Sequence, residues 1–147
     1  MRGEYHNTID EKGRIMIPPR LREQLGTTEV VLTKSMDNCI WLYTEPGFDQ
    51  LETAICGGPL SALNEDSRRL ERAIVSPARN VNFDKTGRIT IPIELREYAE
   101  LFGKEECVVL GTRQCIEIWS QKKFDEYMNG GSEPLKEAAK ALSQGAK

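Results

Sequence analysis

The chain has 147 residues, of which 39% are hydrophobic and 29% are charged, as in an ordinary folded globular protein. Its formal net charge of -3 and isoelectric point near 5.3 argue against a protein that coats nucleic acid by bulk attraction. No apolar run approaches the roughly 18 residues of a membrane span, and the first residues lack the apolar stretch of an export signal.

The four cysteines predict neither a disulfide framework nor a zinc site, because no C-x-x-C pair is present and only one histidine accompanies them. This pattern fits a reduced, cytoplasmic compartment. Cys39 and Cys115 each directly precede an isoleucine at matching positions, and we expect both to be small buried hydrophobes.

No catalytic constellation is visible in the sequence. The single histidine, His6, has no identifiable serine or cysteine partner, and no phosphate-binding loop or metal-ligand motif is present. The sequence therefore predicts a protein that is not an enzyme, with no cofactor, no metal ion and no small-molecule substrate.

One motif, Asp-x-x-Gly-Arg-Ile-x-Ile-Pro, occurs twice, at residues 10–18 and 84–92. The copies are 74 residues apart, and the match continues through Leu-Arg-Glu at 21–23 and 95–97. A repeat of this kind indicates one structural unit used twice. We therefore expect a fold with pseudo-two-fold symmetry.

In each copy, one strand is expected before the motif and one inside it. Asp at the first position and Gly at the fourth predict a type I turn closed by a left-handed glycine, Gly13 or Gly87. The two strands around each turn are expected to form a tight β-hairpin with a bulge at the glycine. The expected strands are 5–9, 14–17, 78–83 and 88–91.

Short helices are expected to begin at Pro18 and Pro92, because proline suits the first helical turn, and to stop at Gly26 and Gly103. Two more strands and a short amphipathic helix follow in each half, so each unit reads β-β-α-β-β-α. These later strands are expected at 30–33, 40–43, 107–110 and 116–119.

A single unit of about 45 residues is too small to bury a stable core by itself. We therefore expect the two units to share one pseudo-two-fold, barrel-like sheet, in a mainly β, α+β fold with flanking short helices. The expected organisation is unit 1 at 5–47, a helical connector at 48–75, unit 2 at 76–119, and a C-terminal helix and tail at 120–147.

The connector is expected to contain a helix over 60–75 with a narrow apolar stripe flanked by charges. Packing on the sheet and contact with another subunit both remain open for this stripe. The tail at 133–147 is expected to form a short helix.

Arg14 and Arg88 directly follow the two turns, and two interpretations of them remain open. An ion pair with Asp10 or Asp84, four residues earlier, would steady the turn. Alternatively, the aspartate orients the arginine, whose guanidinium edge faces a ligand. A planar fork of donors suits phosphate oxygens, or the O6 and N7 acceptors of guanine in the major groove.

Further basic residues near the motif are candidates for phosphate contacts that fix the register on a nucleic acid. These are Lys12 and Lys85 at the turn tips, with Arg2 and Arg20 nearby. Residues 2–22 contain five basic and three acidic side chains, which gives a local charge of +2 in an acidic chain. We expect the first copy to be the more basic at its tip and to make the primary contact.

At these residues the sequence resembles the MraZ family, whose units belong to the AbrB-like swapped-hairpin class. The resemblance runs from Gly3-Glu4-Tyr5 through the last helix of unit 2, and the paired D-x-x-G-R motifs 74 residues apart make it specific. It implies that the two units pair within one chain as two AbrB-like chains pair in a dimer. It also implies Arg14 as the DNA-reading residue with Asp10 as its orienting partner, and Arg88 with Asp84 in the matching places.

The resemblance further implies a bacterial, cytoplasmic, nucleoid-associated transcription factor that binds double-stranded DNA. Members typically repress the operon of cell-division and cell-wall genes in which they are encoded, and they assemble into homo-oligomeric rings. Several identical turns on one face of a ring would bind repeated short DNA boxes through effective concentration.

Two other classes of function remain open. An AbrB-like protein-interaction module of the antitoxin type would need a partner-binding tail, for which only residues 133–147 are available. An enzyme on a pseudo-symmetric barrel would need polar groups clustered in a pocket, and the sequence offers none that turn chemistry leaves unexplained.

Overall fold

The computed structural model describes residues 1–129 and 132–145. The strands are β1 (Gly3–Thr8), β2 (Arg14–Met16), β3 (Glu29–Lys34), β4 (Ile40–Tyr43), β5 (Arg79–Asn82), β6 (Arg88–Thr90), β7 (Glu106–Gly111) and β8 (Ile116–Ser120). The α-helices are α1 (Pro19–Leu25), α2 (Glu45–Cys56), α3 (Glu65–Leu70), α4 (Ile93–Ala99), α5 (Gln121–Met128) and α6 (Glu133–Gly145). A 3₁₀ turn (Ser61–Leu63) and a π-helical turn (Glu71–Val75) flank α3.

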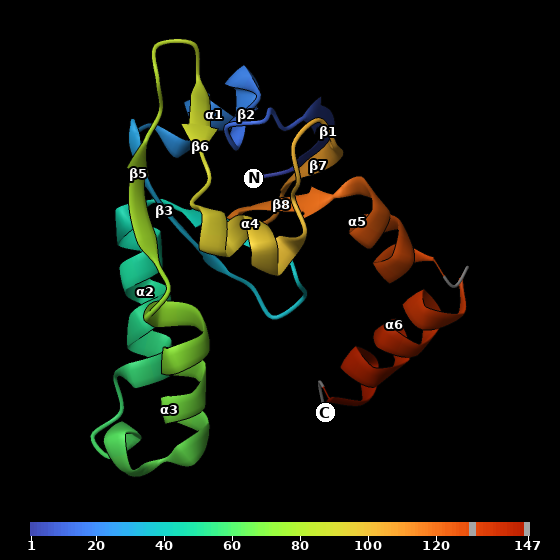
Figure 1. Ribbon diagram of the computed structural model, residues 1–147. Coiled ribbons are helices and arrows are strands. Elements are labelled where there is room, and N and C mark those ends of the chain that lie inside the picture. The colour runs from blue at the N-terminus through green and yellow to red at the C-terminus, as the bar shows by residue number, and fades with distance from the viewer. Residues whose placement is uncertain (130–131, 146–147) are drawn as a thin grey trace.

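Six strands form one antiparallel sheet in the order β1-β7-β8-β4-β3-β5, and β2 pairs with β6 in a separate two-stranded ribbon (Figure 1). The expected α+β, mainly β class is confirmed. The expected barrel is wrong, because β1 and β5 remain at the two edges of the sheet and pair neither with each other nor with the ribbon.

The two strands around each turn do not pair with each other, so the predicted hairpin ladders are also wrong. β1 of unit 1 pairs with β7 of unit 2, and β5 of unit 2 pairs with β3 of unit 1. The sequence specifies each turn, but the apolar faces of its strands can pair within a unit or between units. Exchange between units lets both copies contribute to one core.

The pairing of β2 with β6 is unchanged when the two copies of the repeat are exchanged. Arg14 lies opposite Thr90, and Met16 lies opposite Arg88. Because 14 matches 88 and 16 matches 90 in the repeat, exchanging the two units reproduces the same register. This is the pattern that a two-fold axis through the central Ile15–Ile89 pair produces.

The main core draws its side chains from both units. It includes Ile9, Ile15, Ile17, Leu21, Val30, Leu32, Ile40, Ile89, Ile91, Leu95, Val109 and Ile118, all at most 1% exposed. On another surface of the sheet, α2 packs Phe48 against Val31 and Tyr43, and α5 packs Phe124 against Trp119. Neither unit has a separate core, as expected from its small size.

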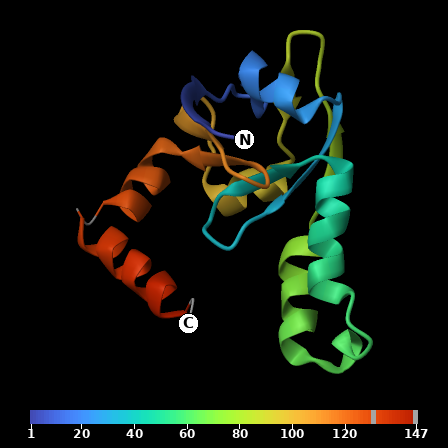
Figure 2. The same ribbon diagram turned by 180° about the vertical axis from the view of Figure 1, so that it is seen from behind.

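The connector differs from the expected continuous helix over 60–75. Asn64 interrupts it, because its side chain caps α3 by accepting a hydrogen bond from the Ser67 amide at 3.1 Å. Of the four residues in its apolar stripe, only Ile74 is buried; Leu60, Leu63 and Leu70 are exposed. α2 and α3 pack together and extend below the sheet (Figures 1 and 2).

Helix α4 ends at Ala99 and not at Gly103, because Glu100 takes the left-handed conformation (φ 55°) that closes the helix. Leu101 then turns into the core with no exposed surface. The tail forms α6, and every residue of this helix is exposed. Among the described residues, no helix combines the length and hydrophobicity needed to cross a bilayer.

Candidate functional site

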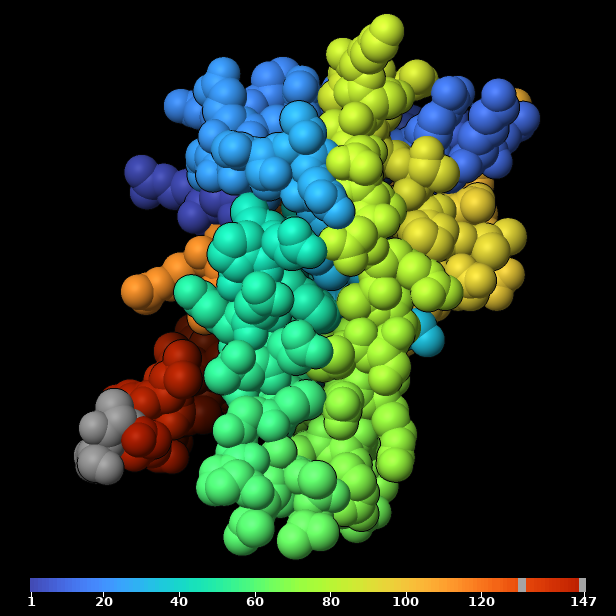
Figure 3. Space-filling view, turned by 90° about the vertical axis from the view of Figure 1, so that its left-hand side faces the viewer, coloured from blue at the N-terminus to red at the C-terminus, as the bar shows by residue number. Residues whose placement is uncertain are grey.

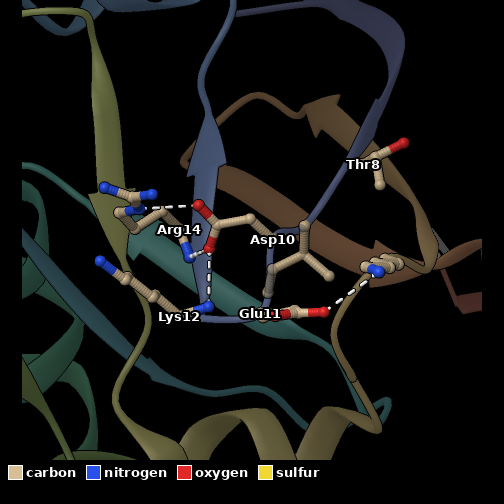
Figure 4. Close-up of a pocket in the computed structure, with 7 residues that line it drawn as sticks. Thr8, Asp10, Glu11, Lys12 and Arg14 are labelled. Atoms are coloured by element: carbon tan, nitrogen blue, oxygen red, sulfur yellow. Dashed lines mark hydrogen bonds and ion pairs between the residues drawn. The ribbon is translucent and has the colours of Figure 1, made fainter.

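Turn 1 (residues 10–14) has the predicted geometry. Gly13 has a left-handed φ of 81°, and its amide donates to the Asp10 carbonyl at 3.0 Å. The Asp10 carboxylate accepts from the amides of Lys12 (2.9 Å) and Arg14 (2.8 Å) through Oδ1. Its Oδ2 accepts from Arg14 Nε at 2.7 Å (Figure 4). One side chain therefore fixes both the turn and the arginine that follows it.

Turn 2 (residues 84–88) repeats this network. Gly87 has a φ of 86°, and Asp84 Oδ1 accepts from the amides of Thr86 and Arg88, both at 2.9 Å. Arg88 Nε donates to Asp84 Oδ2 at 2.9 Å. The Thr86 hydroxyl adds a bond to Oδ1 at 2.8 Å that turn 1 lacks, since Lys12 occupies the matching position.

These bonds favour the ionised form of both aspartates. The amide of Arg14, and next its guanidinium, lower the pKa of the Asp10 carboxyl. The pKa of Asp84 is lowered further below its ordinary value, first by the Arg88 amide and then by the Thr86 hydroxyl. The structure therefore confirms that Arg14 and Arg88 each form an ion pair with the aspartate four residues earlier.

The ion pairs leave part of each arginine exposed. Each pair uses Nε, and about a third of each side chain remains accessible, 33% for Arg14 and 34% for Arg88. Because the Nη edge is not the one that contacts the aspartate, an oriented guanidinium can still donate to a ligand. The two interpretations left open by the sequence are thus compatible.

Both arginines project from the same face of the ribbon. Side chains alternate along a strand, and the central Ile15 and Ile89 face the core with 1% exposure. Arg14, Arg88 and Thr90 therefore lie on the outer face. Arg14 and Arg88 are diagonal neighbours across the two strands, a relation that places Cα atoms about 7–8 Å apart.

A second pair of arginines, which the sequence analysis did not assign, joins the units. Arg22 Nε donates to the Ile17 carbonyl at 2.8 Å, and its guanidinium lies directly over Gly87 of turn 2. Arg96 does the same from unit 2, with the Ile91 carbonyl at 2.8 Å and Gly13 of turn 1 beneath it. The repeated Leu-Arg-Glu was the signal for this role.

The structure places the other basic residues proposed from the sequence at different positions relative to the two turns. Lys12, Lys85, Arg2 and Arg20 are all exposed. Lys12 borders a hollow with Asp10 and Arg14 beside turn 1. Arg20 lies on α1, the helix whose Pro19 and Arg22 border a hollow with Asp84 of turn 2, but Arg20 does not line that hollow. Arg2 is separated from turn 1 by the six residues of β1.

The expectation that the first copy is the more basic at its tip is wrong. Turn 1 carries Glu11 beside Lys12, whereas turn 2 carries Lys85 beside Thr86. The matching window 76–96 has four basic and two acidic residues, again +2. Glu11 is also paired with Lys104 at 3.1 Å.

The remaining candidates take structural roles. Cys39 and Cys115 are buried, as expected, and burial raises the pKa of Cys115 to about 11. His6 is exposed, with Nδ1 2.8 Å from the Gln121 side-chain oxygen. Across residues 1–129 and 132–145, no cluster of three or more His, Cys, Asp or Glu side chains could hold a metal ion.

The fold and the turns define a class of protein: two strand-exchanged units that present an oriented arginine at two equivalent corners of one ribbon. The model of one protein family, described as "MraZ protein, putative antitoxin-like", matches the chain twice, at residues 1–72 and 74–144. The chain belongs to the MraZ family, which confirms the resemblance seen in the sequence.

Similar proteins named "Transcriptional regulator MraZ" are found in several bacteria. The protein of Treponema denticola is 37% identical over 144 residues, which cover 98% of each chain. Those of Moorella thermoacetica and Halothermothrix orenii are each 39% identical over 140 residues, covering 95% of this chain and 94% of the relative. The name describes a regulator, in agreement with the expectation that the chain is not an enzyme.

Among solved structures, the solution structure of PHS018 from Pyrococcus horikoshii is similar over 80% of this chain and 91% of that chain. The sequence identity is 16% and the TM-score is 0.35. A likeness at this level supports no argument about fold or function.

Proposed function

We propose that the protein is a sequence-specific, DNA-binding transcriptional regulator whose contact surface is the outer face of the β2–β6 ribbon with its two turns. The observation that carries the proposal is the placement of Arg14 and Arg88, each oriented by an aspartate, on the same exposed face. The names of the relatives support the regulatory role.

The ribbon suits the major groove physically. That groove is about 12 Å wide and admits a two-stranded β-ribbon, and arginine binds the O6 and N7 acceptors of guanine with two parallel hydrogen bonds. Arg14 and Arg88 are the proposed base readers. Lys12, Lys85 and Arg20 are exposed around the two turns and are proposed to contact phosphates. Arg2 is separated from turn 1 by strand β1, and we propose that it contacts a phosphate at the edge of the DNA-binding surface.

We further propose that the protein acts as a homo-oligomeric ring. A chain with a net charge of -3 and few cations on each ribbon would bind DNA weakly by itself. Identical ribbons on one face of a ring multiply that affinity through effective concentration, and they would match short boxes repeated along a promoter. Exposed apolar side chains of the connector, Leu60, Leu63 and Leu70, are candidates for contacts between subunits.

From the family relation we propose the regulatory setting. The protein is proposed to be cytoplasmic and nucleoid-associated, and to repress the operon of cell-division and cell-wall genes that includes its own gene. Transcription of that operon in cells that lack or overproduce the protein tests the sign of this effect.

Replacement of Arg14 tests the proposal directly. Arg14→Ala is expected to abolish specific binding to the protein's own upstream DNA in a gel shift, while size-exclusion chromatography shows unchanged assembly. Arg113→Ala, which removes an exposed arginine of the β7–β8 loop, is the matched control and should bind normally. Binding by the parent should fall steeply with added salt, because phosphate contacts release counterions. Full operator affinity of Arg14→Ala at physiological salt would reduce Arg14 to a structural residue.

A second candidate is a protein-interaction module of the antitoxin type, which the family description itself favours. Helix α6 carries exposed Leu135 and Leu142, so an apolar stripe is available to a protein partner. Removal of residues 133–147 separates the candidates. DNA binding that survives this truncation supports the ribbon, whereas a ribbon variant with normal regulation would favour the protein partner.

A further inference from the structure

Turn 1 and turn 2 differ in the segment that lies next to each of them. Unit 1 joins α1 to β3 with residues 26–28, whereas unit 2 joins α4 to β7 with residues 100–105. The second segment is thus longer by three residues, six against three. Both segments make the same backbone bond to the strand before the opposite turn, from Phe83 to Thr28 at 2.9 Å and from Ile9 to Glu105 at 3.1 Å.

The extra residues of unit 2 contact turn 1. The Lys104 amide donates to the Ile9 carbonyl at 2.7 Å, and Lys104 Nζ lies 3.1 Å from Glu11 Oε1. Gly103 packs against the backbone of Glu11 so closely that an added Cβ would lie 3.0 Å from the Glu11 Cα. The segment therefore presses on the turn through its backbone as well as through charge.

The segment is itself anchored at two points. Leu101 is fully buried in the main core, and Glu100 pairs with Lys123 of α5 at 2.9 Å. Lys104 has a left-handed φ of 69°, which directs its amide to Ile9. A support that is fixed in this way can restrict the motion of the turn that it touches.

Turn 2 lacks this support. In the described part of the chain, no hydrogen bond or ion pair joins residues 26–28 to residues 84–86, and the only bond of this segment to the preceding strand is Phe83 to Thr28. The end of the β5–β6 connection stands clear at the top of the molecule (Figures 1 and 3). The two turns thus share the bonds from their aspartates to the backbone and to the arginine, and turn 2 adds the Thr86 hydroxyl bond. They differ in the contacts that each receives from the neighbouring segment.

We propose that residues 100–105 are a positioning element for turn 1, and that Gly103 and Lys104 make turn 1 the turn that discriminates between DNA sequences. This inference rests on the proposed DNA-binding function. A pre-organised reading group loses less conformational entropy on binding and tolerates fewer misplaced bases. Turn 2, which lacks a support like residues 100–105 and exposes Lys85, adapts more to the DNA backbone. It therefore contributes more to affinity than to sequence discrimination, and Arg88 discriminates between bases less than Arg14 does.

Gly103→Val tests the proposal, because a branched side chain here must displace the backbone of Glu11. We expect the ratio of operator affinity to affinity for unrelated DNA to fall about 5- to 150-fold, the range lost with one good arginine–guanine contact. Affinity for unrelated DNA should change by less than about twofold, because phosphate contacts are retained. Gly58→Val is the matched control, since an added Cβ at Gly58 meets nothing within 4 Å.

Hydrogen exchange without DNA gives an independent measurement. Amides of residues 10–14 should be better protected than those of residues 84–88 in the parent, and Gly103→Val should remove the difference. Lys104→Gly keeps the left-handed backbone and loses only the exposed ion pair, so it should retain most of the protection.

The outcomes separate the two proposals. Normal discrimination by Gly103→Val, with Arg14→Ala inactive, overturns the positioning role and leaves the DNA-binding function intact. A parallel loss of operator and unrelated binding also overturns the positioning role, since it would indicate general damage. If Arg14→Ala binds its operator normally, the proposed DNA-binding function is wrong, whatever the hydrogen-exchange measurements show.

Discussion

Turn 1 and turn 2 have equivalent backbones but different surroundings. Each has a left-handed glycine and an aspartate that holds the following arginine through Nε. Turn 1 is supported by residues 100–105 of the other unit, whereas turn 2 stands free of the shorter segment 26–28. The repeat therefore specifies the shape of each turn, while the length of the neighbouring segment decides which outside contacts that turn receives.

The strand exchange also redistributes charge between the two corners. Turn 1 has Glu11, which Lys104 pairs, whereas turn 2 has Lys85 and lies beside the helix that bears Arg20. A corner built from both units cannot be evaluated from the residues of one unit. The sequence-based ranking of the two tips was wrong for a local reason, because Glu11 offsets Lys12 in turn 1, whereas turn 2 has Lys85 beside the uncharged Thr86.

The largest expected effect tests what the turns share. Ile15→Ala and Ile89→Ala each remove a side chain that is 1% exposed at the centre of the ribbon. Each change should destabilise the protein by about 2–5 kcal/mol, measured by denaturant unfolding. Because the ribbon belongs to both units, hydrogen exchange should show that either change loosens both turns. Loosening of turn 1 alone by Ile15→Ala would contradict the shared ribbon.

The second effect sharpens the difference between the turns. Gly13→Ala and Gly87→Ala both place a Cβ on left-handed backbone and against the guanidinium of Arg96 or Arg22. Each should cost about 1–3 kcal/mol in thermal or denaturant unfolding. Turn 1 cannot shift away from its support, so Gly13→Ala should be the more destabilising. Equal losses would indicate that residues 100–105 do not restrain turn 1.

The smallest expected effect concerns pH. The pKa of Asp10 and that of Asp84 are lowered in the folded state from the ordinary 3.8, mainly by bonds from the Arg14 and Arg88 amides. A lowered pKa gives stability that is present above the unfolded value and is lost as pH falls through the folded value. Protection of the Arg14 and Arg88 amides, measured relative to their intrinsic exchange rate at each pH, should therefore fall only below about pH 4, and first at turn 1. Asp84→Asn should remove this pH response at turn 2 alone.

Much of the local structure was predictable from the sequence. The D-x-x-G-R motif predicted both turns and the position of each arginine, because a left-handed glycine and an aspartate acceptor are local requirements. The termination of α4 was predicted less well. Gly103 was the expected stop, but Glu100 closes the helix so that Leu101 can enter the core.

The sequence by itself determined that one unit is used twice, that each copy has a tight turn followed by an arginine, and that one copy has too few residues to bury a large core. Those properties depend on residues close together in the chain and on the amount of apolar surface available. Only the tertiary structure decided that strands are exchanged, that Arg14 and Arg88 share one ribbon face, and that residues 100–105 support turn 1. These choices depend on which distant apolar faces pack together, and a local pattern is compatible with several such pairings.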